Sequence, residues 1–337
     1  MHRRSKVKRY ALGTFSAGDG ARFVGLVMNE RVASLVGLAA VHCESELLQA
    51  TTVLALLENW STNEPALARL ADKVAENDGQ WHALAELHTH PAIDLPRQIF
   101  CTGANYRKHV VDLTVDAKVG PEGLDEAALR RWAEAMMDER LASGEPYAFT
   151  KPVSAVSGAF DPLVLPGTTN KPDWELELAV VIGRGGYQIS RERALDHVAG
   201  YAIVNDISAR DLIPRTDYKM LGTDWLRSKG QPGFLPLGPY LVPKAFVPDP
   251  HRLKMRLTVS GQVMQDETTA DMLFGIERQI EYISRYSRLL PGDVICTGSP
   301  AGNGTHYNRF LCDGDVMEAE IEGLGRQRQI CIAQQRG

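Results

Sequence analysis

Two glutamates are spaced along the chain in a way that suits a metal centre. In residues 173–182 (DWELELAVVI), Glu175 and Glu177 are two positions apart within an apolar run. Side chains alternate along a strand, so both carboxylates would project from the same face. Ala179 and Val181 continue that face with apolar side chains, which indicates that it is buried further along. Two carboxylates at such a place repel each other and lose hydration, so they need a cation, a proton or a basic partner.

Asp206 is the candidate for a third ligand. It follows the apolar segment 201–205 (YAIVN), and the end of a strand holds a side chain rigidly beside a crevice. Three carboxylates without a histidine or cysteine suit a hard cation such as Mg²⁺ or Mn²⁺ better than zinc. The spacing alone also fits a plainer interpretation, because Glu-x-Glu on a strand is more often a stripe that faces solvent. Other motifs must decide between the two.

The segments that would position these acids are short strands separated by glycine and proline. The predicted strands are 176–182, 201–205, 253–259, 294–297, 316–321 and 327–332, and the predicted helices are 125–141 and 270–286. Strands and helices do not alternate regularly. The pattern therefore favours an α+β fold with a mixed, rolled or barrel-like sheet over a doubly wound parallel sheet.

The chain is predicted to contain two domains. Residues 1–95 would form a small N-terminal α+β domain, and residues 96–337 the catalytic domain. The boundary is placed within 81–96, because that stretch has no clear period and carries two prolines.

Within the N-terminal domain, a hairpin is expected over 23–35, with its turn at Asn29 and Glu30. A helix is expected over 47–57, where leucines and alanine recur at helical spacing. Residues 61–64 (STNE) offer a capping box for a second helix.

Composition excludes several classes of protein. Apolar residues make up 44% and charged residues 23%, which is ordinary for a soluble globular protein. A net charge of −5 provides no electrostatic footprint for nucleic acid. No apolar run approaches the length of about 18 residues that crosses a bilayer, and no signal peptide is recognisable. Five scattered cysteines without a Cys-x-x-Cys pair argue against a disulfide framework and a zinc site, and suit a reducing cytoplasm.

Four motifs follow one another at distances similar to those of the fumarylacetoacetate hydrolase family. They are DWELELAVVIG at 173–183, GYAIVNDISARD at 200–211, PLGP at 236–239 and PGDVICTGSPAG at 291–302. The similarity runs from about residue 99 to about residue 332. The Thr-Gly-Ser-Pro-Ala-Gly block is the most specific element.

The resemblance implies a catalytic domain on a mixed, rolled sheet, usually assembled as a homodimer. The family's three metal carboxylates match Glu175, Glu177 and Asp206, which would hold Mg²⁺ or Mn²⁺. The remaining matches are the family's active-site lysine at Lys229, its glycine-rich threonine loop at Thr297 and Gly298, and its arginine at Arg210. Lys151, in Phe-Thr-Lys-Pro, resembles a family position near the site.

Smaller bacterial-type members of this family also carry Asn-Tyr-x-x-His-x-x-Glu. The corresponding run is 105–112 (NYRKHVVD), so the resemblance implies a catalytic dyad of His109 and Asp112, with Tyr106 near the substrate. Positions i and i+3 are neighbours on a helix, which suits the pairing. The segment 105–146, expected to be a lid, is much longer than the compact lid of small members.

The reaction predicted from these parts is hydrolytic C–C cleavage of a 1,3-dioxo acid such as an acylpyruvate or fumarylpyruvate. His109, oriented by Asp112, would take a proton from water, and Lys229 and the Thr297 loop would donate hydrogen bonds to the oxyanion. The metal would act as a Lewis acid toward the enolate. Arg210, Tyr106, Gly298 and Lys151 are the candidate substrate-binding residues.

Two alternatives remain open. The same site without a positioned water would support decarboxylation or enol–keto isomerisation of a small oxo-acid. A non-catalytic metal-binding protein on an inherited fold is the second alternative, and the retention of the acids with His109, Lys229 and Thr297 argues against it. His88-Thr89-His90 lacks a third ligand and is interpreted as incidental.

Overall fold

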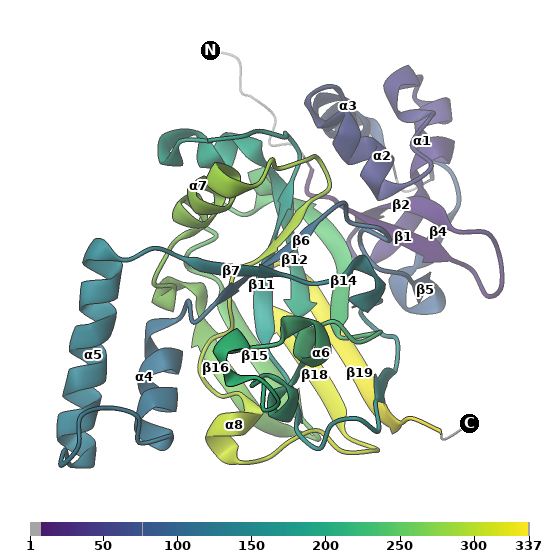
Figure 1. The fold of residues 1–337 in the computed structure, drawn as a ribbon. Coiled ribbons are helices and arrows are strands. Elements are labelled where there is room, and N and C mark those ends of the chain that lie inside the picture. Colours follow the sequence, from purple (N-terminus) through teal and green to yellow (C-terminus); the bar gives the residue numbers. More distant parts are fainter. Residues whose placement is uncertain (1–7, 76, 336–337) are drawn as a thin grey trace.

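The computed structural model describes residues 8–75 and 77–335, and it has an α+β fold (Figure 1). Its largest sheet contains the strands β1 (Ala11–Ser16), β2 (Phe23–Met28), β3 (Arg31–Ser34), β4 (Trp81–Ala83), β5 (His88–Thr89), β6 (Ile99–Gly103), β7 (Tyr147–Thr150), β8 (Val156–Ser157), β11 (Leu176–Ile182), β12 (Val198–Asn205), β14 (Leu235–Pro243) and β17 (Val294–Cys296). The hydrogen-bonded order is β4-β3-β2-β1-β14-β12-β11-β17-β6-β7, with β5 on β1 and β8 on β14. The mixed sheet that was predicted is confirmed, as an open sheet.

A second sheet packs against the first. It contains β9 (Leu163–Leu165), β15 (Lys254–Val259), β16 (Gln262–Thr268), β18 (Val316–Ile321) and β19 (Gly325–Ala333), in the order β16-β15-β18-β19-β9. A small pair joins β10 (Pro172–Asp173) to β13 (Ser208–Ala209). The helices are α1 (Leu35–Val41), α2 (Val53–Glu58), α3 (Trp60–Lys73), α4 (Arg107–Asp116), α5 (Glu126–Ser143), α6 (Trp225–Lys229), α7 (Ile276–Tyr286) and α8 (Gly304–Tyr307). No helix among the described residues is both long and apolar enough to cross a membrane.

Strand β11 is buried on both faces, as its sequence indicated. Leu178 and Val180 belong to an apolar cluster that includes Leu257 of the second sheet. Ala179 and Val181 belong to another cluster, which includes the leucines of the helices α2 and α3. The large sheet therefore lies between the second sheet on one face and N-terminal helices on the other.

The N-terminal hairpin is confirmed, whereas the two helix predictions beside it are partly wrong. Asn29 and Glu30 both have left-handed φ values, 50° and 60°, and join β2 to β3. The expected helix over 47–57 begins only at Val53, because the Thr52 side chain accepts a hydrogen bond from Ala55 N and caps the helix there. The capping box at 61–64 is wrong, since α3 already begins at Trp60, whose ring is buried.

The large sheet does not stop at the predicted domain boundary. Leu12 of β1 is paired with Leu241 of β14, so the N-terminal strands extend the catalytic sheet. The stretch 81–96 contributes β4 and β5 to the same sheet. The division at residue 95 stays a prediction, and hydrogen bonds between strands cross it.

Helices α4 and α5 project together from one side of the molecule (Figure 1). Two ion pairs join them: Arg107 Nη2 lies 2.9 Å from Asp138 Oδ1, and Arg130 Nη1 lies 2.8 Å from Asp112 Oδ1. The predicted helix over 125–141 corresponds to α5. The predicted helix over 270–286 begins later, at Ile276, because residues 269–271 form a separate 3₁₀ turn.

Candidate metal centre and active site

The three predicted acids converge where β11 and β12 meet. Leu176 is paired with Asn205, so the residue before β11 lies beside the residue after β12. Asp206 N donates to the Glu175 carbonyl oxygen at 2.8 Å, and Glu175 N donates to Asn205 Oδ1 at 2.8 Å. One oxygen of each of Glu175, Glu177 and Asp206 lies within 4.8 Å of the others, and all three residues are buried. Local strand geometry therefore builds the cluster.

Glu177 is held by the glycine of the Thr-Gly-Ser block. Gly298 N donates to Glu177 Oε2 at 2.8 Å. Gly298 has a φ of +97°, and a Cβ there would lie 2.8 Å from Asn105 Cβ, so a larger residue would displace this donor. Burial, together with the nearby Asp206 carboxylate, raises the pKa of Glu177 well above its usual value. The position suits an added positive charge.

Two buried lysines hold Asp206 from either side. Lys229 Nζ lies 2.6 Å from Asp206 Oδ2 and 2.5 Å from Glu175 Oε2. Lys151 Nζ lies 2.5 Å from Asp206 Oδ1 and also donates to the carbonyls of Ile207 and Phe234. Burial alone would lower the pKa of Lys229, but Asp206 and Glu175 raise it above its usual value. Lys229 therefore stays charged.

Arg210 connects the cluster to a fourth acid, Asp173. Its Nη2 lies 2.5 Å from Glu175 Oε1, and its Nε lies 2.8 Å from Asp173 Oδ2. Asp173 is fully buried and also accepts from Gly304 N at 2.6 Å. Burial opposes ionisation of Glu175, but Arg210 and Lys229 outweigh it and lower its pKa. Asp173 was not among the predicted site residues, although it stands two positions before Glu175 in the sequence, at the end of β10.

The donor set fits a hard divalent cation. It consists of carboxylate oxygens from Glu175, Glu177 and Asp206, which Mg²⁺ and Mn²⁺ prefer. Lys229, Lys151 and Arg210 already pair with Glu175 and Asp206, whereas the hydrogen bond to Glu177 within the described residues comes from Gly298 N alone. A buried carboxylate with one neutral donor leaves a charge for a cation to balance.

His109 faces the same cavity, but its predicted partner does not bond to it. Burial, helped by Arg210 and Lys229, lowers the pKa of His109 to about 4, so the imidazole is neutral at pH 7. Asp112 Oδ1 instead accepts from Arg130 Nη1, and no hydrogen bond joins the two members of the dyad among the described residues. The helix i, i+3 relation is confirmed by α4, yet the dyad itself is not assembled in this structure.

The cavity beside the acids has a volume of about 330 Å³. The ionisable residues of its lining are Glu175, Glu177, Asp206, Arg210, Lys229 and His109. Its larger apolar residues are Val110, Leu113, Val119, Phe149 and Trp225. The remaining lining residues are Thr102, Gly103, Ala104, Thr114 and Ser299. The apolar group was not singled out from the sequence. It comes from α4 and the loop after it, from β7 and from α6, which are distant along the chain.

Five of the predicted site residues do not line the cavity: Asp112, Gly298, Thr297, Tyr106 and Lys151. The Thr297 hydroxyl is fully buried and donates to the Leu178 carbonyl at 2.9 Å. Tyr106 is fully buried in the core, with its hydroxyl 3.5 Å from Met255 Sδ. Lys151, as described above, holds Asp206. Lys151 therefore supports Asp206 and Thr297 supports β11 instead of lining the space for a substrate, whereas Tyr106 is packed in the core.

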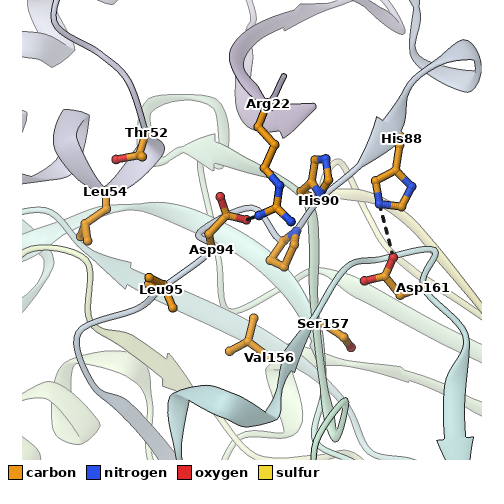
Figure 2. A pocket seen from close by; sticks show the side chains of 11 residues that line it. Arg22, Thr52, Leu54, His88, His90, Asp94, Leu95, Val156, Ser157 and Asp161 are labelled. Atoms are coloured by element: carbon orange, nitrogen blue, oxygen red, sulfur yellow. Dashed lines mark hydrogen bonds and ion pairs between the residues drawn. The ribbon is translucent and has the colours of Figure 1, made fainter. Parts of the chain in front are cut away.

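A larger cavity of about 580 Å³ lies between the N-terminal helices and β8 (Figure 2). His88 and His90 stand in its wall with ring centroids 4.4 Å apart, and Arg22 lies 3.4 Å from Asp94. None of the predicted site residues lines it. The group of acids that the described residues bring within metal-binding distance is at the smaller cavity, so we assign the chemistry there.

Comparison with known proteins agrees with this geometry. A family model described as fumarylacetoacetate (FAA) hydrolase C-terminal matches residues 98–331. A 2,4-didehydro-3-deoxy-L-rhamnonate hydrolase from Sphingomonas sp. (strain SKA58) is 44% identical over 188 residues, which are 55% of this chain and 64% of that protein. The chain thus spans less than two thirds of that relative.

Two further relatives match nearly the whole chain. An oxaloacetate tautomerase from Bacillus subtilis (strain 168) is 33% identical over 321 residues, covering 92% of this chain and 97% of that protein. The solved structure of a fumarylacetoacetate hydrolase from Exiguobacterium antarcticum has a TM-score of 0.73 and 26% identity, and covers 96% of this chain and 100% of that one. These two matches therefore include the N-terminal region in addition to residues 98–331.

Proposed function

Because the chain belongs to the fumarylacetoacetate hydrolase family, we propose that it is a divalent-metal-dependent hydrolase of small 1,3-dioxo acids such as acylpyruvates. One observation carries the proposal: three buried carboxylates, a charged lysine and a neutral histidine line one small cavity. The reaction adds water to the acyl carbonyl and breaks the adjacent C–C bond. An acylpyruvate anion and water become pyruvate and a carboxylic acid, which releases its proton to give the carboxylate.

The chain's own residues divide the work as follows. His109 accepts a proton from water at one ring nitrogen, which its low pKa leaves free at neutral pH, and then gives that proton up to the departing carbon. Lys229 donates to the substrate oxygen that gains negative charge, from a position fixed by Glu175 and Asp206. Arg210, held by Asp173, keeps Glu175 in place.

Glu175, Glu177 and Asp206 would hold the cation, Mg²⁺ or Mn²⁺. When bound, it supplies a Lewis acid that favours the enolate of the pyruvate product. The recorded pairing of Asp112 with Arg130 leaves His109 to act as a base without a carboxylate partner. Gly298 supports Glu177, and Thr297 fixes the strand end beside it.

A second candidate is enol–keto tautomerisation of a small oxo-acid, with decarboxylation as a variant of the same chemistry. The observation that favours it is the Bacillus subtilis relative, an oxaloacetate tautomerase matched over 92% of this chain. Tautomerisation needs the acids, Lys229 and a proton-transferring group, and does not need a positioned water. The non-catalytic alternative would require the same residues to have been retained without use.

One set of assays separates these candidates. Purified protein with Mg²⁺ or Mn²⁺ is given acetylpyruvate, and pyruvate is followed with a coupled lactate dehydrogenase reaction. The proposal expects one pyruvate and one acetate per molecule consumed, and loss of activity on chelation. Faster decay of enol oxaloacetate without pyruvate would support tautomerisation, and pyruvate from oxaloacetate would support decarboxylation. Protein that binds metal and converts neither compound would support the non-catalytic alternative.

The proposal also includes a homodimer in the cytoplasm, which rests on the family resemblance and on the composition. Sedimentation at micromolar concentration would test the assembly, and a monomer would contradict it.

A further inference from the structure

The catalytic cavity has two walls of different chemistry. The ends of β11 and β12 supply the carboxylates and their basic partners. Helix α4 adds Val110 and Leu113, which are half-buried apolar residues beside His109. Leu113 is one helical turn after His109, so the two side chains are neighbours on α4. The tail of a substrate that reacts beside His109 would therefore lie against Leu113.

Two stacked aromatic rings form the second part of the apolar wall. The rings of Phe149 and Trp225 are stacked, with centroids 4.5 Å apart and planes at 15°. Trp225 Nε1 donates to the Tyr147 hydroxyl at 2.7 Å, which fixes the indole in place. Lys229 Nζ lies 5.4 Å from the Phe149 ring centroid, so this wall begins directly beside the acids.

The cations of the lining are already matched by acids. Arg210 contacts Asp173 and Glu175, and Lys229 contacts Glu175 and Asp206, at distances of 2.5 to 2.8 Å. The charged residues of the lining are these two cations and the acids Glu175, Glu177 and Asp206. A 2-oxo acid would place its first carboxylate and its oxo oxygen there.

Three basic residues of the lid are paired with acids, and its other lysine and arginine residues, Lys118, Arg131 and Arg140, do not line the cavity. Arg107 pairs with Asp138, Lys108 with Glu267, and Arg130 with Asp112. None of these three basic residues lines the cavity. A second carboxylate at the far end of a substrate would therefore be desolvated against Val110 and Leu113 without a cation to balance it, which is costly.

We propose that Val110, Leu113, Phe149 and Trp225 select an uncharged, short alkyl tail and reject a dicarboxylic substrate. The inference rests on the proposed function. It states that an uncharged tail distinguishes the substrates of this chain from dicarboxylic oxo-acids such as oxaloacetate. The volume of about 330 Å³ limits the tail to a few carbons, because the reacting oxo-acid fills part of it.

Butanoylpyruvate and succinylpyruvate provide a matched pair of probes. They share the same reacting centre and the same tail length, and differ in ending with a methyl group or a carboxylate. We expect kcat/KM for butanoylpyruvate to exceed that for succinylpyruvate by about 100-fold, the range that differential burial of one group gives. Equal values, or a preference for succinylpyruvate, would overturn the inference.

Substitution of Leu113 tests the wall itself. Leu113→Arg should raise kcat/KM for succinylpyruvate by about 10-fold and lower it for butanoylpyruvate, since it adds the missing cation. Leu124→Arg adds the same charge to the lid at an exposed position outside the cavity, and should leave the ratio unchanged. Leu113→Ala should lower kcat/KM for butanoylpyruvate more than for acetylpyruvate, whose tail is shorter.

These outcomes can be told apart from failure of the proposed function. Wild-type protein that converts neither acylpyruvate would contradict the hydrolase proposal. Wild-type protein that converts both, with a ratio that neither Leu113 variant changes, would contradict the specificity inference alone. Because the ratio in the wild type needs no variant, the test survives if Leu113→Arg does not fold.

Discussion

Lys229 Nζ lies between two of the three clustered acids, 2.5 Å from Glu175 Oε2 and 2.6 Å from Asp206 Oδ2. The lysine thus supplies a positive charge that the chain itself carries, while among the described residues Glu177 receives only the backbone N–H of Gly298. The negative charges of Glu175 and Asp206 are thus matched by positive side chains, and the charge of Glu177 is not. This asymmetry decides what removal of each residue should do.

Lys229→Met should destabilise the metal-free protein and strengthen its response to metal. Removing one partner of a buried ion pair costs about 3 kcal/mol or more, because the remaining charges are unpaired. A bound cation would replace that charge, so Mn²⁺ should raise the melting temperature more in the variant than in wild type. Thermal unfolding with and without chelator measures this, and exposed Lys219→Met is the control. Equal metal-free stability in Lys229→Met and wild type would contradict the assigned contacts.

Glu177→Gln should abolish tight Mn²⁺ binding and leave the metal-free fold at least as stable. The amide oxygen can still accept from Gly298 N, and it carries no charge to desolvate. Mn²⁺ titration by calorimetry, together with thermal unfolding, tests both parts. Glu318→Gln, at an exposed position on β18, should bind metal as wild type does. Wild-type affinity in Glu177→Gln would remove Glu177 from the metal centre.

His109→Ala should lower kcat for acylpyruvate hydrolysis by about 100-fold or more, with metal affinity unchanged. Asp112→Asn should have a much smaller effect, because Asp112 contacts Arg130 rather than His109. Steady-state kinetics of both variants decide the question, with His306→Ala as a control outside this cavity. A loss in Asp112→Asn as large as in His109→Ala would mean that the dyad forms when substrate binds.

Glu44 should make stability depend on pH below the usual pKa of a glutamate. Hydrogen bonds from Lys73 and Arg69 lower the pKa of Glu44 in the folded state, with carboxylate contacts of 2.6 and 2.8 Å. The unfolded chain therefore binds more protons, so this contribution is present above about pH 4.3 and is lost as the pH falls further. Both partners are half exposed, so we expect about 1 kcal/mol.

Urea unfolding of wild type and Glu44→Gln at pH 7 and below pH 4 measures this contribution. The difference between the two proteins should shrink at the lower pH. Glu46→Gln is the matched control, since Glu46 shares Arg69 at a longer distance of 3.3 Å and is more exposed. A difference that does not change with pH would exclude an ionic origin.

The metal cluster could be predicted because its geometry is local to two strands. Glu175 directly precedes β11 and Glu177 lies within it, two positions apart, and the apolar run before Asp206 marks the end of β12. The fold class followed from the same reasoning together with the motifs. Each of these features depends on residues close in the chain, which a single sequence displays.

Features that depend on distant residues were missed. The partner of Asp112 is Arg130, on another helix, and nothing in the spacing of α4 points to it. Strand β1 was not among the predicted strands; it contains Gly13, where a Cβ would lie 2.7 Å from the Phe15 ring. Strand β14 was not predicted either, and it contains prolines, which are depleted in strands in general. Tertiary packing decides such positions.

The pairing of β1 with β14 has a practical consequence for shortening the protein. Cutting the chain near residue 95 would remove β1 and leave the Leu241 side of β14 as an open sheet edge. Unpaired N–H and C=O groups on such an edge recruit strands from other molecules. A truncated catalytic fragment should therefore aggregate even with every acid of the metal centre in place. By pairing with β14, strand β1 protects this edge of the sheet from pairing with strands of other molecules.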